Sequence, residues 1–114
     1  MTNDSEIQHP CPILPEDYAV WSSSKMGKST IFQSDRLLVG LNSFEVGQEH
    51  VLHTHPGMDK VYLVVAGEGV FLLEDRQLEL VSGQMLVAPA DVPHGVRNDG
   101  PDPLLVLVFL APSP

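Results

Sequence analysis

Short runs of apolar and β-branched residues alternate with turn-forming residues along most of the chain. The runs recur at intervals of about 8–12 residues, which is the spacing of strands in an all-β sandwich or barrel. No long window shows the apolar stripe of an amphipathic helix. The pattern therefore predicts an all-β domain. The expected strands are Tyr18–Trp21, Ser29–Gln33, Leu37–Phe44, Val51–His55, Lys60–Ala66, Val70–Leu73, Gln77–Val81, Met85–Ala88, His94–Asn98 and Leu104–Leu110.

The N-terminal segment carries three closely spaced prolines, Pro10, Pro12 and Pro15. Proline lacks a backbone N–H and fixes φ, so this density excludes a helix or a central strand. We expect residues 1–15 to form an extended arm, which is either mobile or lies across a partner subunit. Residues 16–114 should form one domain, because no repeat, linker or low-complexity tract divides them.

Two of the expected strands, Val61–Val65 and Leu104–Leu110, are apolar on both faces. A strand with one face in water normally alternates apolar and polar residues. Because the chain has no spare helix to cover the second face, another subunit is the simplest cover. We therefore expect a homodimer. The alternative is that both segments are central strands of a closed barrel.

The chain is acidic, with a net charge of −9 from 15 acidic and 6 basic residues and no run of like charge. Such a surface repels phosphate backbones and anionic lipid headgroups, which argues against nucleic acid and membranes as partners. The single cysteine, Cys11, allows no intramolecular disulfide and no cysteine-based metal site. No segment has the apolar length of a membrane span or the layout of a signal peptide. We expect a cytoplasmic protein.

Three of the five histidines have the spacing of a metal site. His53 and His55 are separated by one residue, so on a strand both side chains point to the same face. His94, on a later strand, can complete three nitrogen ligands around one cation. The alternative is that all three are buried, hydrogen-bonded residues without a metal. His9 and His50 fall outside this pattern. His50 has odd parity relative to His53, and we expect both His9 and His50 on the surface.

The histidines lie in two segments with a fixed spacing of glycine, proline and asparagine, one spanning residues 47–67 and the other 83–98. These segments resemble the two signature motifs of the cupin superfamily. The resemblance implies a double-stranded β-helix, or jelly-roll, barrel that encloses a ligand-sized cavity. It also implies one divalent transition metal, since cupins are reported with Fe, Mn, Ni, Zn or Cu. The matching positions are Gly47, His53, His55, Gly67, Gly83, Pro89, His94 and Asn98.

Two positions depart from the cupin motifs. A motif glycine is replaced by Asp91, at a turn position that readily accepts Asp. The position of the family's carboxylate ligand is occupied by Lys60, and Asp59 precedes it. Neighbouring residues of a regular strand face opposite sides, so Asp59 and Lys60 cannot both point inward without a bulge or a turn.

Three arrangements of this position remain open. In the first, Asp59 reaches the metal from the Pro56-Gly57 turn and completes a site of three histidines and one carboxylate. In the second, the histidines bind alone, while Lys60 stays clear of the cation or anchors an anionic substrate. In the third, the ammonium of Lys60 weakens the site so far that it is often empty, because a cation beside a dication is unfavourable.

The resemblance implies three hypotheses of function. The first is a small metalloenzyme, oxygenase-like or an isomerase or lyase, acting on an oxygen-rich small molecule that the metal chelates. Lys60 or Tyr62 would assist as anchor or proton donor, unless Tyr62 is a core tyrosine with a satisfied hydroxyl. The second is a non-catalytic small-molecule, sugar-binding or sensor module, because a fold does not determine a function. The third is a structural barrel without a ligand.

Overall fold

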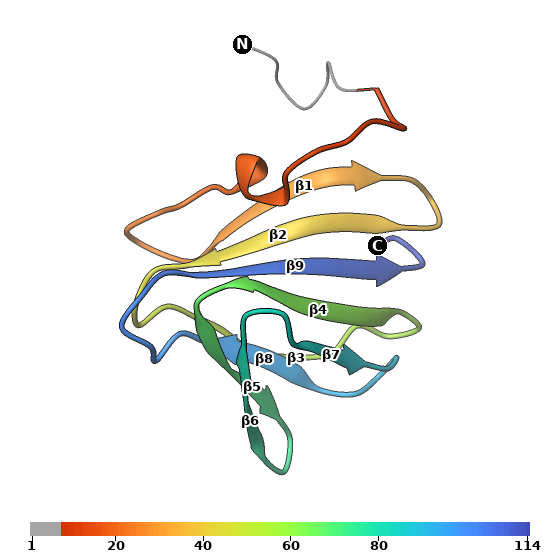
Figure 1. The fold of residues 1–114 in the computed structure, drawn as a ribbon. Coiled ribbons are helices and arrows are strands. Elements are labelled where there is room, and N and C mark those ends of the chain that lie inside the picture. Colours follow the sequence, from red (N-terminus) through yellow and green to blue (C-terminus); the bar gives the residue numbers. More distant parts are fainter. Residues whose placement is uncertain (1–7) are drawn as a thin grey trace.

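Nine β-strands form most of the regular structure in residues 8–114, the part of the chain that the computed structural model describes (Figure 1). All strand pairs are antiparallel. The predicted all-β class is confirmed. The strands are β1 (Gly27–Gln33), β2 (Leu38–Phe44), β3 (Glu49–His53), β4 (Asp59–Ala66), β5 (Glu68–Leu73), β6 (Gln77–Val81), β7 (Met85–Ala88), β8 (His94–Arg97) and β9 (Leu104–Ala111).

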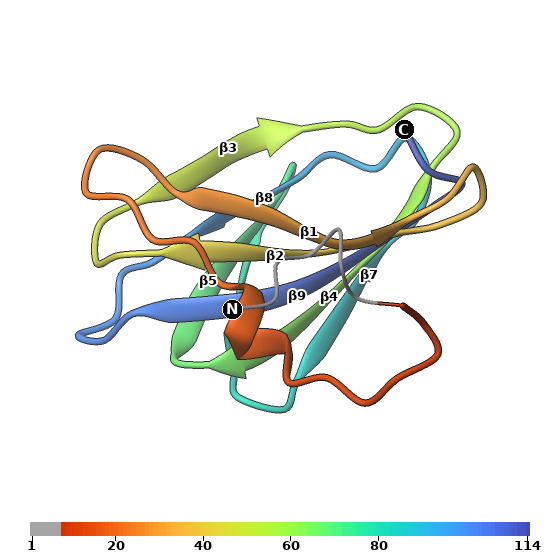
Figure 2. The ribbon, with the colours of Figure 1, turned by 90° about the horizontal axis from the view of Figure 1, so that it is seen from above.

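The strands form two sheets (Figure 2). The two sheets share one apolar core. One sheet has the order β1-β2-β9-β4-β7 and the other has the order β3-β8-β5-β6. Phe44 and Tyr62 from the first sheet pack in the same buried cluster as Phe71 and Val96 from the second. Two antiparallel sheets enclosing a core are the architecture of the predicted jelly-roll barrel.

Strict alternation on β4 places its side chains on the two faces of the sheet. Lys60, Tyr62 and Val64 are buried, whereas the residues between them are only partly buried. This period of two is the geometry of a pleated strand, and it turns Lys60 and Tyr62 toward the interior between the sheets.

The outer face of the five-stranded sheet is covered in part by the chain's own N-terminal segment. Tyr18, Ile31, Leu41 and Leu105 form a second buried cluster, against which Ile13 packs. The covering side chains come from a short 3-10 helix, Pro15–Tyr18 (η2), and the residues beside it. One cover for the apolar strands is therefore intramolecular, in addition to the second subunit expected from the sequence.

The strand expected at Tyr18–Trp21 is wrong, because the structure has the η2 turn and irregular backbone there. Pro15 favours this turn, since its fixed φ suits the first position of a helix. Of the predicted arm, residues 1–7 lie outside the described residues. None of the helices in residues 8–114 is long and apolar enough to cross a membrane.

Four glycines of the two motif segments have positive φ: Gly47 (+89°), Gly57 (+71°), Gly67 (+84°) and Gly83 (+90°). Asp91 also has a positive φ, of 68°, which an Asp side chain tolerates better than most residues. The turn predicted at Asp91 is confirmed. At Gly67 the backbone also runs close to the carbonyl of Pro103, where the chain enters β9.

We predict that G67A destabilises the protein by at least about 2 kcal/mol more than G83A. Both glycines have nearly the same φ, so the backbone strain of a non-glycine residue is common to the two variants. Only at position 67 would the added Cβ overlap the carbonyl oxygen of Pro103, whereas no atom of residues 8–114 lies within 4 Å of a Cβ at position 83. Urea unfolding of both variants measures the difference, and equal losses of stability would contradict the close approach.

Candidate metal centre

The three histidines of the predicted metal site meet between the ends of β3 and β8. His53 is the last residue of β3 and pairs across the sheet with His94, the first residue of β8. His55 follows in the turn after β3. One ring nitrogen from each of the three histidines lies within 4.8 Å of the other two. Among the described residues, no carboxylate and no cysteine joins these three converging nitrogen ligands.

A β-bulge, not simple alternation, sets the orientation of these rings. The pairing of β3 with β8 shifts register between His50 and His53, so their odd separation no longer sends them to opposite faces. His50 is half-buried, and its ring stacks on that of His53 at a centroid distance of 4.1 Å. The expectation of a surface position is therefore wrong for His50, whereas His9 is exposed as predicted.

Strand β3 also begins and ends two residues earlier than expected, at Glu49 and His53 in place of Val51 and His55. His55 therefore reaches the group from a turn. Its carbonyl oxygen accepts the backbone N–H of Met58 at 3.2 Å and lies 3.5 Å from the N–H of Asp91. These contacts, and not the alternation of a strand, position its backbone beside His53.

Backbone carbonyls orient two of the rings. Nδ1 of His53 donates to the carbonyl of Val51 at 2.7 Å, and Nδ1 of His94 donates to that of Val92 at 2.8 Å. A carbonyl oxygen can only accept, so the hydrogen is on Nδ1 and the lone pair of Nε2 is free. This is the usual arrangement of a metal-binding histidine, in which the second ring nitrogen is held by a hydrogen bond.

The Nε2 atoms of His53, His55 and His94 are buried, and none has a hydrogen-bond partner among the described residues. A buried polar atom without a partner is costly, and native structures contain few of them. Three such atoms within reach of one another fit a divalent transition metal, which imidazole nitrogens bind well. Hydrogen bonds to the part of the chain that the structure describes leave these three nitrogen atoms unsatisfied.

Burial also keeps the histidines neutral, which is the form that binds a metal. Desolvation lowers the pKa of His94 to about 4 and that of His50 to about 3, with further lowering by nearby cationic groups. Desolvation lowers the pKa of His53 and of His55 in the same way. At neutral pH these rings carry lone pairs and no net charge.

The structure turns Lys60 toward the interior and Asp59 away from it. Lys60 is 3% exposed, and its Nζ lies 4.8 Å from the centre of the Tyr62 ring. Asp59 is exposed, and its Oδ1 accepts the backbone N–H of Ala90 at 2.8 Å. Asp59 therefore does not lie beside the histidines. The ligand atoms that converge come from His53, His55 and His94 alone among the described residues.

Tyr62 lies in the core next to the histidines. Its ring centre is 5.9 Å from that of His94, and its hydroxyl is buried without a hydrogen-bond partner among the described residues. Burial raises the pKa of this phenol, so it stays protonated and remains a donor. The alternative expectation, a core tyrosine whose hydroxyl is hydrogen-bonded, is therefore wrong for Tyr62 within the described residues.

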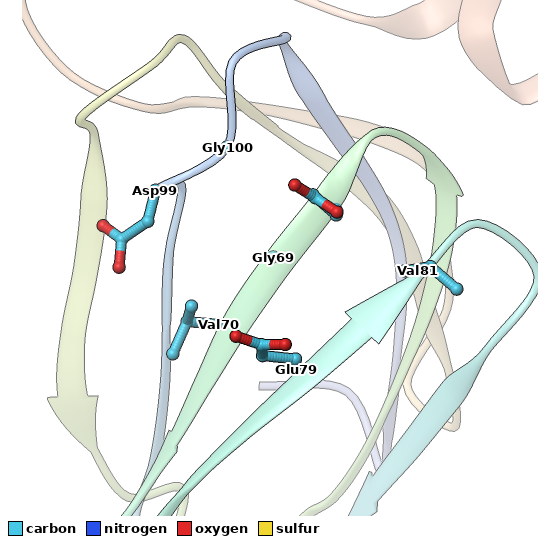
Figure 3. A pocket seen from close by; sticks show the side chains of 7 residues that line it. Gly69, Val70, Glu79, Val81, Asp99 and Gly100 are labelled. Atoms are coloured by element: carbon cyan, nitrogen blue, oxygen red, sulfur yellow. The ribbon is translucent and has the colours of Figure 1, made fainter.

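A cavity of about 130 Å³ adjoins the histidines, with His50, His55 and Lys60 in its wall. Two further wall residues, Lys28 and Asn42, face each other across β1 and β2 and were not singled out in the sequence. Asn42 and Ser43 are the two polar residues of a largely apolar strand, and this was the signal in the sequence that could have pointed to Asn42. A second hollow, over β5 and β6, is lined by Glu68, Glu79 and Asp99 among others and shares no residue with the metal centre (Figure 3).

The segment that contains the histidines matches a known family of domains. The family model of the Cupin domain matches residues 40–110. An uncharacterized protein of Methanocaldococcus jannaschii is 31% identical over 62 residues, which cover 54% of this chain and 50% of that protein. The chain thus spans about half the length of the curated relative that it matches.

Solved structures of similar chains have the same architecture. The protein TT1209 from Thermus thermophilus is 40% identical, with a TM-score of 0.83 over 87% of this chain and 94% of that one. An RmlC-like cupin protein from Desulfovibrio desulfuricans is 27% identical, with a TM-score of 0.82 over 91% and 98% of the two chains. A Klebsiella pneumoniae protein with a double-stranded β-helix domain is 24% identical (TM-score 0.84, 89% of both chains), which shows the fold alone.

We predict that the metal-free protein loses stability as the pH falls from about 6.5 toward 4. Histidines of the unfolded chain take up protons near pH 6.5, whereas burial holds the pKa of His94 at about 4 and that of His50 at about 3. The unfolded state therefore binds more protons in this window, and acid favours unfolding. We expect the melting temperature in chelator to be about 10 °C lower at pH 4.5 than at pH 7.

Carboxylates also titrate in this range, so the control is a His50→Gln, His94→Gln double variant. Its melting temperature should fall less between the same two pH values. An equal fall in the double variant and the unmodified protein would contradict the assignment to these histidines.

Proposed function

Because the chain belongs to the cupin family, as its two motifs predict, we propose that it is a small metal-dependent enzyme acting on an oxygen-rich small molecule. The observation that carries the proposal is the set of buried Nε2 atoms on His53, His55 and His94, which have no partner among the described residues. They converge beside a cavity with further polar groups in its wall. Oxygenase-like chemistry and isomerase or lyase chemistry are the reaction classes that this proposal includes.

His53, His55 and His94 would hold one divalent transition metal, whose identity among Fe, Mn, Ni, Zn and Cu the imidazole donors leave open. When bound, the metal supplies a Lewis acid that polarises a substrate oxygen. Lys60 presents its ammonium from the cavity wall and would orient the substrate. The Tyr62 hydroxyl, a buried donor without a partner among the described residues, would give or share a proton.

One observation favours a second candidate, a non-catalytic binding or sensor module. The position of the motif's carboxylate ligand is held by Lys60, and Asp59 points away from the histidines. A site without its own carboxylate offers one ligand fewer to the metal, and it has no acidic side chain to accept a proton from a substrate. The two candidates share the metal and the cavity and differ in turnover.

We predict that H94Q reduces metal affinity by at least about 100-fold, since it removes one of three ligands and leaves the fold's core packing nearly unchanged. The unmodified protein should retain about one metal ion per chain after loading with Zn²⁺ and desalting, as measured by elemental analysis. H9Q is the matched control, because His9 is an exposed histidine outside the group. Equal zinc content in H94Q and the unmodified protein would rule out this centre.

Turnover separates the two candidate functions. Protein loaded in turn with Fe²⁺, Mn²⁺, Ni²⁺, Zn²⁺ and Cu²⁺ would be assayed for oxygen consumption and product formation with diketones, catechols and flavonols. Activity that disappears in H94Q and persists in H9Q supports the enzyme. Saturable binding without product in every metal form supports the sensor module.

We also propose that the protein is a cytoplasmic homodimer that uses the outer face of the five-stranded sheet near its β7 edge. Met85 and Val87 on β7 are 58% and 56% exposed, and they pair with Leu63 and Val61 on the same face. The N-terminal segment packs over the other end of this sheet, around Leu41. A second copy presents the same apolar strip, so a two-fold pair covers both strips at once.

We predict that light scattering after size-exclusion chromatography gives twice the chain mass for the unmodified protein. An M85K, V87K double variant should have the mass of a monomer. Charged side chains at the centre of an apolar contact carry a desolvation cost that the paired state cannot recover. V81K is the matched control, because Val81 is also an exposed valine but lies on β6 of the other sheet. A monomeric unmodified protein would contradict the dimer.

A further inference from the structure

The lysines of this acidic chain are gathered in one place. The chain has only three, Lys25, Lys28 and Lys60, against 15 acidic residues. All three line one or both of two neighbouring hollows, the cavity beside the histidines and a groove outside it. A surface lysine for solubility can lie anywhere, so this distribution indicates a local electrostatic purpose.

Within residues 8–114, the wall of the inner cavity contains hydrogen-bond donors and no carboxylate. Lys28 and Lys60 supply two ammonium groups. The side-chain amide Nδ2 of Asn42 and Nδ1 of His50, two further wall residues, are buried without a hydrogen-bond partner among the described residues. Donors that converge on a cavity without acceptors of their own match a ligand that is rich in acceptors, and an anion most of all.

Lys60 is the most costly of these groups. It is 3% exposed, and the ion pairs within residues 8–114 join arginines to aspartates, so no carboxylate neutralises its charge. Burial, and then the nearby Lys28, lower its pKa to about 8, so it still carries its proton at pH 7. A buried ammonium without a counter-ion is destabilising, and folds retain such groups mainly where a ligand pairs with them.

We propose that this cavity binds the carboxylate of a small organic acid between Lys60 and Lys28, while a second oxygen of the same molecule faces the three-histidine centre. The inference rests on the proposed metal site and names the substrate class for it. The volume of about 130 Å³ limits the enclosed part of the ligand. An engineered cavity of about 150 Å³ takes up benzene, so a ligand of roughly six non-hydrogen atoms fits.

The outer groove provides the way in. It lies between β1 and β3, the edge strands that leave the sandwich open on this side, and measures about 590 Å³. Lys28 and His50 line both the groove and the inner cavity, so they stand where the two hollows adjoin. Lys25 adds a second lysine to the lining of the groove, and among the described residues Glu49 is the only acidic one there. The gradient of positive charge steers an anion inward past an otherwise acidic surface.

Pyruvate and pyruvamide provide a matched pair of probes, since both have six non-hydrogen atoms and only pyruvate carries a charge. Calorimetric titrations of the zinc-loaded protein should show tighter binding of pyruvate. K60M should weaken pyruvate binding by about 10- to 100-fold, the loss expected when one charge-assisted hydrogen bond is removed, and K28M should weaken it less. Pyruvamide binding should change little in either variant. R36M is the control, because Arg36 is exposed and lines neither hollow.

Folding of the key variant is not a concern, because K60M replaces a buried charge by an apolar chain of similar length. Its melting temperature should rise by several degrees at pH 7. A more stable protein with weaker pyruvate binding identifies a binding role, which a purely structural role for Lys60 would not produce.

The outcomes separate this inference from the metal proposal. Unchanged pyruvate affinity in K60M, equal affinity for pyruvate and pyruvamide, or no pyruvate binding at about 20 mM, well above the millimolar Kd of a weak ligand, would each overturn the anion site, whatever the zinc content. If the protein binds no zinc but the metal-free form still prefers pyruvate in a Lys60-dependent way, the metal proposal fails and the anion site stands.

Discussion

The pairing of β3 with β8 is the constraint on which the site depends. It places His53 opposite His94, and the register shift between His50 and His53 turns His50 to the same side. Hydrogen bonds from the two Nδ1 atoms to carbonyls of the same short segments then aim the free nitrogens at a common region. The centre is thus assembled by backbone pairing first and by side-chain rotamers second.

Buried Asn98 supports this pairing from the far end of β8. Its side-chain amide donates to the carbonyls of Phe44 and Asp102 at 3.0 Å, and its Oδ1 accepts the N–H of Gly100. Its backbone exchanges hydrogen bonds with Gly47 and Gln48, at the turn before β3. The asparagine of the second motif segment therefore has a structural role here, since it joins the three loops that hold β3, β8 and β9 in place.

The sequence could predict what depends on regular alternation or on a long-range spacing. The period of two on β4 correctly put Lys60, Tyr62 and Val64 on one face, and the two motif segments correctly indicated the jelly-roll fold. It could not predict the bulge that brings the His50 ring against that of His53, because register depends on the partner strand. Nor could it locate Lys28 in the cavity wall. The pairing of β1 with β2 puts Lys28 there, and the register of that pairing cannot be deduced from the sequence of either strand alone.

The departure at Lys60 and the composition of the cavity have a common explanation. A dication on three neutral histidines, beside the buried ammonium of Lys60 and with the exposed Lys28 also in the cavity wall, would leave a strongly positive site. Such charge is stable only when an anion enters with it. In the cupin motif the protein's own carboxylate occupies the position that Lys60 takes here, and in this chain the nearest candidate, Asp59, is held outside by Ala90. The missing negative charge is then supplied by the ligand, so that binding of the ligand also neutralises the positive charge of the cavity wall.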